Sequence, residues 1–400
     1  MAKKKTCNVA LVGTKFMGRA HANAYLKVGK FFDLPVQPVM HTVAARDKVA
    51  TPAFADRWGW ANASTNWRAV VENDEVDLVD VCTPNNYHEP IAIAALENGK
   101  HVACEKPLAA TLDVARRMRD AARKAKRKGV RTFVWFSYRG CPAQGLARQM
   151  VQQGKLGQIY HVRANYLQGW AGPDTPLVWR FSGKVAGSGA HGDLGAHSID
   201  AARFITGEEI TEVTGAIEKT FIKERVIPEM DSGNIKGGRV AKGKKKMGKV
   251  TVDDAVLFLA RLSGGGVASF EATRFAIGNQ NANRIEINGE KGSVRWDFED
   301  ANVLWYYNAA DDSQRAGWQR IMCTDAAKHP FAHAWWPDAH TLGYEHGFIN
   351  MASCMFCEVA GRKMEVAMPD FEDAYQTQRV LEAAVTSARE RTPVKLSEVK

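Results

Sequence analysis

The first third of the chain alternates short apolar runs with amphipathic segments, and this alternation restricts its fold more than any other feature of the sequence. The apolar runs have the length and composition of strands, and the segments between them carry apolar residues at helical spacing. Strands separated by helices imply right-handed crossovers and a parallel, doubly wound sheet. The predicted strands span residues 8–13, 36–45, 76–82, 101–105 and 131–136, and the predicted helices span 16–28, 49–58, 89–98 and 111–126.

The pattern changes after about residue 138, where strand-like runs follow one another with few helices between them, which predicts a mostly antiparallel sheet. We therefore expect an α/β domain over residues 1–137, and an α+β domain over residues 138–400 with an open sheet and helices on one face. The second domain's predicted strands are 158–170, 211–221, 253–262, 267–276, 284–288, 292–298 and 302–307, and its helices are 143–153, 193–205, 348–361 and 371–389. We expect the last helix to pack near the first domain.

The formal net charge of +10 is concentrated in two short stretches. Residues 3–5 contribute three lysines, and residues 236–249 contribute seven Lys or Arg with no acidic residue, so the remaining chain is formally neutral. The second stretch is also rich in glycine, which predicts an exposed loop. Because two short segments carry the charge without a shaped basic groove, we do not expect a nucleic-acid partner.

The composition, with 45% apolar and 24% charged residues, is typical of a globular chain. No apolar run approaches the ~20 residues of a membrane helix, and the N-terminus lacks a signal-peptide apolar core. Seven cysteines, an odd number at low density, argue against a disulfide framework and favour a reducing cytoplasm. Cys354 and Cys357 lie in an apolar helical pattern and are predicted to be two small core residues.

The turn after the first predicted strand runs Gly13-Thr14-Lys15-Phe16-Met17-Gly18. The dinucleotide fingerprint G-x-G-x-x-G occupies this position between a strand and a helix, where glycines let backbone amides approach a pyrophosphate. Here Lys15 replaces the middle glycine, so an ordinary strand–helix turn remains an alternative. A lysine at this position can instead pair with a phosphate.

The second predicted strand ends at Ala45, followed by Arg46 and Asp47. A carboxylate at this strand tip accepts hydrogen bonds from the adenosine ribose of NAD, whereas an arginine nearby holds the 2′-phosphate of NADP. Ala45 occupies the tip and Asp47 follows it, so the choice between NAD and NADP stays open.

Glu105-Lys106-Pro107 closes the fourth predicted strand, at the sheet edge where open α/β sheets bind ligands. Pro107 keeps Lys106 out of helical geometry. Lys106 can donate to a substrate hydroxyl or carbonyl, or it can form a plain salt bridge with Glu105.

A glycine-rich segment before the predicted helix 193–205 carries Asp193 and His197, four residues apart and so on one helix face. An imidazole held by a carboxylate is a general base that works near neutral pH. One alternative is an N-cap aspartate followed by a core histidine. A metal site with His191, Asp193 and His197 is a second, but no further Cys/His set with ligand spacing supports it.

Clusters of Trp and His lie in irregular segments of the second domain. Trp179-Arg180 precedes the glycine-rich segment, and Trp335-Trp336 precedes His340. Such segments line polar pockets or serve as structural caps, and the sequence does not separate the two.

These motifs together resemble the glucose-fructose oxidoreductase/inositol dehydrogenase/rhizopine catabolism (Gfo/Idh/MocA) family over nearly the whole chain. The resemblance rests on Gly13–Gly18 with Arg19-Ala20-His21, Thr83-Pro84-Asn85 with His88, Glu105-Lys106-Pro107-Leu108, Tyr138-Arg139, and Asp193-x-x-x-His197. Residues around Trp179-Arg180, Arg274, Trp335-Trp336 and Gly343-Tyr344-Glu345 resemble the branch of levoglucosan and related glycoside dehydrogenases. Lys15 and Ala45 depart from the commonest family pattern.

The resemblance implies a Rossmann domain that binds NAD or NADP, followed by a substrate domain. The implied cofactor-binding residues are Gly13, Lys15, Phe16, Met17, Gly18, Arg46, Thr83, Pro84, Asn85, His88, Glu105 and Lys106. The implied substrate-binding residues are Lys106, Tyr138, Arg139, Trp179, Arg180, Asp193, His197 and His340.

The implied reaction is hydride transfer between a sugar, polyol or glycoside hydroxyl carbon and nicotinamide. In it, His197 takes the hydroxyl proton, Asp193 orients His197, and Lys106 donates to the reacting oxygen. Some relatives instead hold NAD tightly and use transient oxidation to cleave a glycoside, an alternative that the sequence does not exclude. The family also implies homodimers or homotetramers built on the sheet of the second domain.

Overall fold

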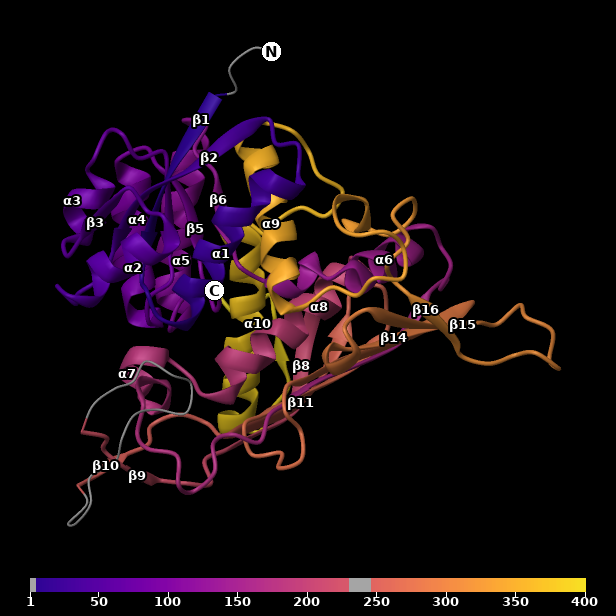
Figure 1. Cartoon of the computed structure of the whole chain (residues 1–400). Coiled ribbons are helices and arrows are strands. Elements are labelled where there is room, and N and C mark those ends of the chain that lie inside the picture. The colour runs from indigo at the N-terminus through magenta and orange to yellow at the C-terminus, as the bar shows by residue number, and fades with distance from the viewer. Residues whose placement is uncertain (1–4, 230–245) are drawn as a thin grey trace. The chain divides into compact units, whose positions relative to one another are not determined.

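The computed structural model describes residues 5–229 and 246–400, and it divides the chain into two compact units (Figure 1). We describe each unit by itself. Within the described residues, the first unit comprises residues 5–140 and Gly343–Tyr375, and the second comprises 141–229, 246–342 and Gln376–Lys400.

The first unit is built on a six-stranded parallel sheet with the strand order β3-β2-β1-β4-β5-β6. This is the doubly wound order in which the chain reverses direction across the sheet between β1 and β4. The strands are β1 (Lys5–Val12), β2 (Val36–Ala44), β3 (Asn62–Ser64), β4 (Leu78–Val81), β5 (His101–Cys104) and β6 (Thr132–Val134). The parallel sheet predicted from the alternating pattern is therefore confirmed.

Helices flank this sheet on both faces (Figure 1). They are α1 (Phe16–Phe31), α2 (Ala50–Trp58), α3 (Trp67–Val71), α4 (His88–Glu97) and α5 (Leu112–Lys126), with short 3-10 helices η1 (Asn85–Tyr87) and η2 (Ser137–Gly140). In α5, Thr111 caps the first turn by accepting from the Val114 amide, and Leu112, Ala115 and Met118 face inward.

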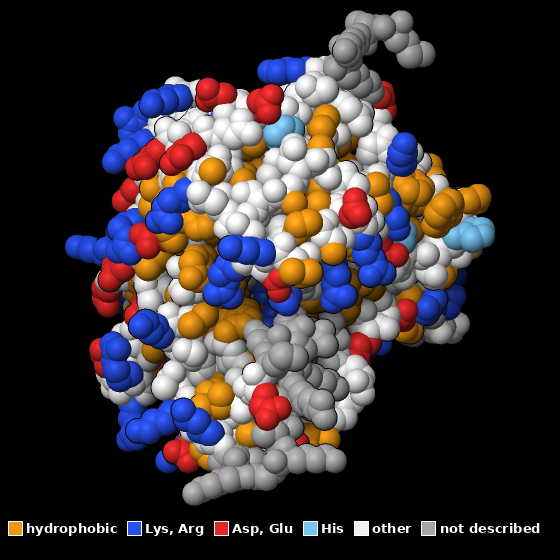
Figure 2. All heavy atoms as spheres, turned by 60° about the vertical axis from the view of Figure 1, so that its left-hand side comes forward, with side chains coloured by type: hydrophobic (Ala, Val, Ile, Leu, Met, Phe, Trp, Pro, Cys, Tyr) orange, Lys and Arg blue, Asp and Glu red, His pale blue; other side chains and the backbone are white. Residues whose placement is uncertain are grey.

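The basic outer face of α5 is exposed and paired with acidic side chains. Arg117 binds Glu89, and Arg123 binds Glu372. Figure 2 shows Lys and Arg side chains dispersed among acidic, apolar and uncharged ones on the drawn face. The basic residues of α5 therefore lie on a solvated helix face, while its apolar residues are buried.

The segment after residue 342 returns to the first unit as α9 (Tyr344–Val359). It packs against α1, and its residues from Gly347 to Cys357 are buried. Cys354 and Cys357 are buried free thiols, which confirms them as core residues. Helix α10 (Phe371–Glu390) begins in the first unit and continues into the second.

The second unit contains a nine-stranded sheet with the order β16-β15-β14-β13-β7-β12-β11-β8-β17. Among these pairs only β7 and β12 run parallel, so the sheet is mostly antiparallel as expected. The strands are β7 (Ile159–Leu167), β8 (Ile210–Lys219), β11 (Ala255–Leu262), β12 (Val267–Thr273), β13 (Ala282–Gly289), β14 (Gly292–Asp297), β15 (Val303–Asn308), β16 (Gln319–Met322) and β17 (Val394–Lys395).

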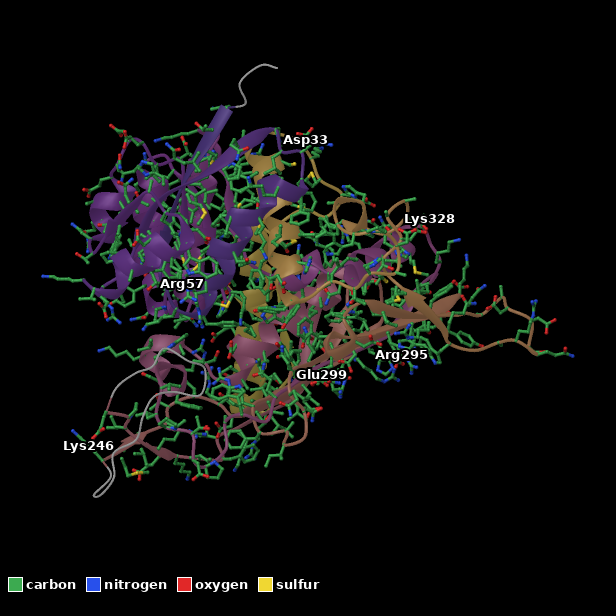
Figure 3. All side chains as sticks on the ribbon, in the orientation of Figure 1. Asp33, Arg57, Lys246, Arg295, Glu299 and Lys328 are labelled. Atoms are coloured by element: carbon green, nitrogen blue, oxygen red, sulfur yellow. The ribbon has the colours of Figure 1, made fainter. Side chains whose placement is uncertain are left out.

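Two helices, α6 (Pro142–Gln152) and α8 (Ala196–Thr206), cover one face of this sheet (Figure 1). Strand residues alternate between this buried face and the other, as the period of two requires. Arg295 lies on the other face, where its guanidinium covers the rings of Trp305 and Trp318 (Figure 3). The same face exposes Ile217, Leu257 and Leu259.

The smaller elements of the second unit are short helices and a two-stranded sheet. They are η3 (Trp179–Phe181), α7 (Gly183–Ala186), the π-helical turn η4 (His191–Gly195), η5 (Phe298–Asp300), η6 (Ala332–Ala334), β9 (Glu224–Val226) and β10 (Met247–Lys249). No helix of the described residues is long and apolar enough to cross a membrane.

The structure corrects several expected boundaries. Of the predicted basic loop, residues 236–245 lie outside the described residues, whereas Met247–Lys249 pairs with β9 as a strand. The short strands β3, β9, β16 and β17 went unpredicted because two to four residues are too few to show periodicity. The last-but-one helix begins at Tyr344 rather than 348, because the His346 ring accepts from the Gly343 amide and caps it.

Candidate active site

The carboxyl ends of β1, β4 and β5 bring three predicted motifs together in the first unit. The Cys82 amide donates to the Val12 carbonyl, and the Glu105 amide donates to the Val81 carbonyl. These bonds hold the ends of the three strands together, so the turns that follow them lie side by side. This is the point where the strand order reverses. Open α/β sheets bind their ligands at this edge.

Gly13 and Gly18 are both required by the geometry of the first turn. Gly13 has φ of +118°, and a Cβ there would lie 2.4 Å from the Cys82 carbonyl oxygen. A Cβ on Gly18 would lie 2.1 Å from the Gly13 carbonyl oxygen. The turn therefore closes on itself and leaves bare backbone at the start of α1, as phosphate binding at a helix N-terminus needs.

Lys15, the departure from the fingerprint, is compatible with this turn. It precedes α1 with φ of −82°, an ordinary conformation for any residue, and its side chain is exposed. Phe16 and Met17 begin α1, and the Phe16 ring stacks on Tyr344 with centroids 6.2 Å apart. The middle position therefore does not depend on glycine for its backbone.

The end of β2 carries no carboxylate at its tip. The strand stops at Ala44, and Arg46 is exposed just beyond it. The Asp47 carboxylate accepts from the amides of Val49 and Ala50 and so caps α2. These bonds, with a smaller contribution from Lys15, lower the pKa of Asp47.

The turn after β4 contains Thr83, Pro84 and Asn85. The Thr83 hydroxyl is inaccessible and makes no hydrogen bond within the described residues. His88 is fully buried, and its ring nitrogens face the carbonyl oxygens of Thr83, Pro107 and Leu108. Since its side chain has no exposed surface, we expect His88 to hold two loops in place rather than to touch a ligand.

The turn after β5 holds Glu105 and Lys106. Glu105 accepts the Lys106 amide on Oε2 at 3.1 Å, and its Oε1 lies 2.9 Å from Nε2 of His21. Tyr138 and Arg139 lie on η2 and are buried, with Arg139 donating to the Asp373 carboxylate at 2.8 Å. Of these predicted residues, Lys106 is the one with a partly exposed side chain.

The first unit fits a nicotinamide dinucleotide. Its glycine turn offers bare backbone at a helix start, and the Thr83 hydroxyl is an unsatisfied polar group on the neighbouring turn. Gly13 and Gly18 would hold its pyrophosphate, and the exposed Lys15 and Arg46 would supply positive charge to its phosphates.

In the second unit, Asp193 and His197 sit where the π-helical turn η4 passes into α8. Such π-turns are frequent at functional sites. Asp193 is 28% exposed, and its Oδ2 accepts from the buried Arg274 guanidinium at 2.8 Å. His197 is 8% exposed, and its ring lies 5.9 Å from that of Tyr166.

The glycine-rich segment before η4 is held by a buried carboxylate that the sequence did not reveal. Asp253 accepts from the amides of Gly189 and His191 at 2.6 and 2.8 Å. A Cβ on Gly189 would lie 1.7 Å from the Asp253 carbonyl oxygen. The close approach of these two segments therefore fixes the start of the turn that carries Asp193.

Arg274 joins the separate parts of this region. Besides Asp193, its guanidinium donates to the carbonyl oxygens of Gly189 and Arg180. Arg180 in turn lies over the Trp179 ring at 4.5 Å. The sequence associates Trp179, Arg180 and Asp193, but it does not show that a buried arginine connects them.

His191 and His340 have local roles. His191 is buried and donates from Nε2 to the Leu381 carbonyl, and burial lowers the pKa of His191. It is therefore a neutral core histidine. Among the described residues, His191, Asp193 and His197 do not form a group whose ligand atoms lie close enough together to share a metal ion. His340 is exposed, with Nδ1 facing the Pro337 carbonyl.

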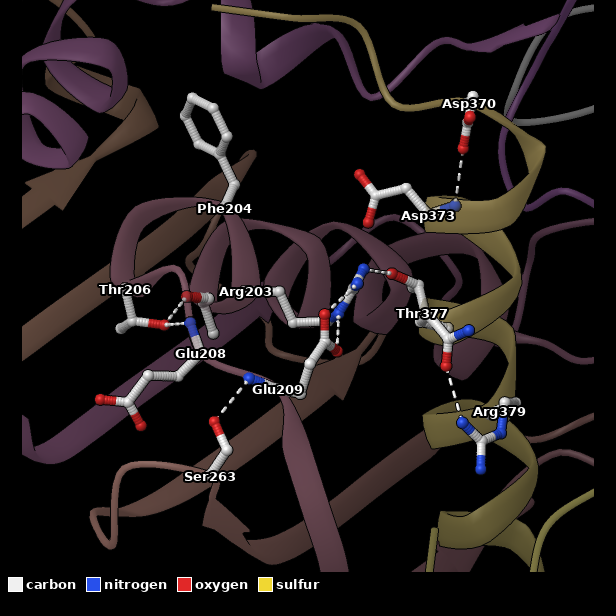
Figure 4. A network of polar contacts seen from close by, with 12 residues as sticks. Arg203, Phe204, Thr206, Glu208, Glu209, Ser263, Asp370, Asp373, Thr377 and Arg379 are labelled. Atoms are coloured by element: carbon white, nitrogen blue, oxygen red, sulfur yellow. Dashed lines mark hydrogen bonds and ion pairs between the residues drawn. The ribbon is translucent and has the colours of Figure 1, made fainter. Parts of the chain in front are cut away.

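The far end of α8 is anchored by Arg203 (Figure 4). Its guanidinium donates to both oxygens of Glu209 and to the Thr377 hydroxyl on α10. The helix that carries His197 is thus fixed at both ends, by Asp253 near its start and by Arg203 near its end.

The comparisons with known proteins identify the family of both parts of the chain. Models of the oxidoreductase family with an NAD-binding Rossmann fold and of the GFO/IDH/MocA C-terminal domain match residues 7–133 and 146–295. A levoglucosan dehydrogenase from Pseudarthrobacter phenanthrenivorans is 37% identical over 395 residues, 98% of each chain.

Two solved structures are similar throughout. An oxidoreductase domain protein from Kribbella flavida superposes with a TM-score of 0.90 at 46% identity, covering 98% of this chain and 99% of its own. Levoglucosan dehydrogenase in complex with NADH and levoglucosan superposes with a TM-score of 0.89 at 36% identity, covering 98% of this chain and 100% of its own.

Proposed function

The chain belongs to the GFO/IDH/MocA oxidoreductases, whose N-terminal part is an NAD-binding Rossmann fold, and on that premise we propose that it oxidises a sugar or glycoside. The reacting group would be a secondary hydroxyl, and the hydride would pass to the nicotinamide of the dinucleotide. The observation that carries the proposal is the Asp193–His197 turn, held on a glycine-rich segment by Arg274 and Asp253.

We propose levoglucosan or a related glycoside as the substrate. The support is a levoglucosan dehydrogenase that matches this chain over 98% of both lengths. A structure of levoglucosan dehydrogenase with NADH and levoglucosan also matches it, at a TM-score of 0.89. Polyols and free aldoses remain the alternatives within the same class of reaction.

His197 is the proposed base that takes the hydroxyl proton. Asp193, an anion paired with Arg274, would orient the imidazole and balance its charge. Lys106 would donate to the reacting oxygen as its carbonyl character develops. These roles rest on the family motifs and on the local geometry of each residue within its own unit.

NAD is the proposed dinucleotide, because the similar levoglucosan dehydrogenase was solved with NADH. Ala45 provides no carboxylate for the ribose, and the exposed Arg46 would accommodate a 2′-phosphate. Both dinucleotides therefore belong in the assay.

The test is a panel of anhydrosugars, glycosides, aldoses and polyols with NAD and NADP, read as absorbance of the reduced cofactor. We expect turnover on levoglucosan or a glycoside, with kcat in the H197A variant lower by ~10²–10⁴-fold. No turnover with any member, or full activity in H197A, would contradict the proposal. Sugar cleavage without added cofactor and without NADH accumulation would instead favour the non-redox glycoside-cleaving alternative.

We also propose that the protein forms a homodimer or homotetramer through the exposed face of the nine-stranded sheet. Ile217 on β8 is 62% exposed, and it pairs across the strands with Leu257 of β11, which is 41% exposed. Leu259 of β11 is 54% exposed on the same face. An apolar patch on an open sheet is characteristic of an interaction surface.

A further inference from the structure

A buried cluster of ionisable groups lies beneath the turn that carries Lys106. His21 on α1 is fully buried, with Nδ1 2.8 Å from Oδ2 of Asp80 on β4 and Nε2 2.9 Å from Oε1 of Glu105. Asp80 and Glu105 are buried as well. The His21 ring is enclosed by Trp135 and Phe348, with centroids at 4.3 and 5.5 Å.

Each contact between a ring nitrogen of His21 and a carboxylate oxygen needs a hydrogen atom between the two atoms. A carboxylate oxygen at 2.8–2.9 Å from a bare imidazole nitrogen would set two lone pairs against each other. Two contacts of this kind are satisfied by one doubly protonated imidazole between two carboxylates. The other solution is a neutral ring with one protonated carboxyl group.

The remaining contacts of the carboxylates favour the charged solution. Asp80 also accepts from the Tyr25 hydroxyl at 2.7 Å and from Nε1 of Trp135 at 2.9 Å. The second oxygen of Glu105 accepts the Lys106 amide. Because both carboxyl groups are surrounded by donors, they are stabilised as anions.

The titration of His21 is consistent with this assignment. Burial by itself lowers the pKa of His21, but Asp80 and Glu105 outweigh it and raise the pKa to about 9. Two other titratable groups belong to this cluster. The Cys82 thiol after β4 lies 3.0 Å from Nδ1 of His21, and the Tyr25 hydroxyl on α1 donates to Asp80. Burial and Asp80 raise the pKa of both well above the ordinary value, so both stay neutral.

We propose that His21 is a permanently protonated positioning residue for Lys106. Its imidazolium holds the Glu105 carboxylate, whose other oxygen holds the Lys106 backbone, so α1 and the end of β5 form one rigid support. The role rests on the proposed function, in which Lys106 donates to the reacting oxygen. His21 itself touches no substrate.

A metal ion is the competing explanation, because among the described residues His21, Asp80 and Cys82 form one group with ligand atoms close enough to share it. The Asp80 carboxylate already accepts from the Tyr25 hydroxyl and from Nε1 of Trp135, which favours a proton over a cation at this place.

The first experiment needs no substrate. Histidine-labelled protein would be titrated by NMR, with the H21F variant used to assign the His21 signal. We expect His21 to be imidazolium at pH 7.5, with a midpoint near 9, and D80N to move that midpoint downward. A neutral His21 at pH 7.5, or stoichiometric zinc in the purified protein, would overturn the proposal.

The second experiment compares kcat and KM on the substrate that the sugar panel identifies. We expect kcat to fall ~10²-fold in H21F and less in H21Q, which keeps one donor, with the KM for NAD changing little. H101Q is the matched control, because His101 lies at the opposite end of β5, where its Nδ1 accepts the Arg131 amide. A kcat in H21F equal to that of H101Q would overturn the proposal.

If H21F does not fold, the pH profiles of D80N and Y25F test the positioning role of His21. D80N removes the charge that keeps His21 protonated, so the alkaline limb of its kcat profile should move to lower pH. Y25F keeps the His21–Glu105 contact and should leave that limb in place. An unmoved limb in D80N would refute the positioning role. A panel without any turnover would refute the proposed function while the NMR titration still tested the charge of His21.

Discussion

At the scale of single residues, buried charges decide which candidate side chains are held in place. Arg274 is 1% exposed and is the charged partner of Asp193. Its guanidinium also binds two carbonyl oxygens, so it fixes both the Asp193 carboxylate and the segment before it. His21 has the same relation to Glu105 in the first unit.

Replacing Arg274 should impair catalysis, because the Asp193 carboxylate loses its charged partner. A hydrogen bond to a charged group contributes about 1.5–3 kcal/mol, so R274M should lower kcat/KM by ~10–10²-fold. R274K keeps the positive charge but loses the forked geometry of the guanidinium, so its kcat/KM should lie between those of wild type and R274M. The matched control is R284M, because Arg284 makes exposed ion pairs on β13 and should keep normal kinetics.

The pH dependence of stability should report the charge on His21. Its pKa is about 9 in the folded protein, above the ordinary 6.5, so folding is favoured by proton uptake. The stabilisation, up to about 3 kcal/mol, is complete below pH ~6.5 and is lost as pH rises through 9. Urea unfolding at pH 6.5 and 9.5 should show a larger loss in wild type than in H21F. Some loss is expected in both proteins, because burial raises the pKa of thiols such as Cys82 and Cys104 in the folded state. An equal loss in both proteins would contradict it.

At the scale of elements, the same residue type has opposite roles within one helix. Gly18 and Gly29 both lie in α1. A Cβ on Gly18 would collide with the Gly13 carbonyl oxygen at 2.1 Å, whereas a Cβ on Gly29 would make ordinary contact with the Gln37 side chain at 3.4 Å. A substitution at Gly29 therefore tests helix propensity alone, whereas one at Gly18 also tests the geometry of the Gly13–Gly18 turn.

Alanine at these two positions should have effects of opposite sign. G29A should raise the free energy of unfolding by roughly 0.5–1 kcal/mol, because alanine favours the helix. G18A should lower it and weaken NAD binding at least tenfold, because backbone must move at the turn. Thermal melting and calorimetric titration with NAD would measure both effects. Unimpaired NAD binding in G18A would show that the turn does not hold the dinucleotide.

At the scale of the whole molecule, the sheet of the second unit has one face covered by α6 and α8 and one face with exposed apolar side chains. Ile217 and Leu257 are cross-strand neighbours on that face. Burying them against a second copy would remove apolar surface from water at about 25 cal/mol per Å².

A charge on this face should therefore dissociate the oligomer. L257K combined with L259K should shift the sedimentation velocity profile to that of a monomer. The helical content of the dissociated subunits, measured by circular dichroism, should stay unchanged. I277K is the matched control, since Ile277 is 87% exposed on the turn after β12, outside the strands of the sheet. A wild-type protein that already sediments as a monomer would exclude the proposed interface.

How much of this could be predicted depends on how far apart the interacting residues lie in the chain. The parallel sheet, the Gly13–Gly18 turn and the Asp193–His197 pair are local patterns, which periodicity and spacing reveal. Arg274 is 81 residues from Asp193, and Glu105 is 84 residues from His21. No local pattern connects such pairs, because their contact depends on how strands and helices are stacked.

The sequence by itself determined the class of each domain, the family, and the two glycines that a tight strand–helix turn demands. Only the tertiary structure decided which carboxylates each buried cation holds, because folding buries Arg274 beside Asp193 and His21 between Asp80 and Glu105. Burial removes water as a competing partner, so an unpaired charge becomes costly and the fold must supply its counterpart. The alternation that restricted the fold therefore predicts the sheet edge that carries one part of the candidate site, and the packing of distant segments supplies the buried partners of the candidate residues.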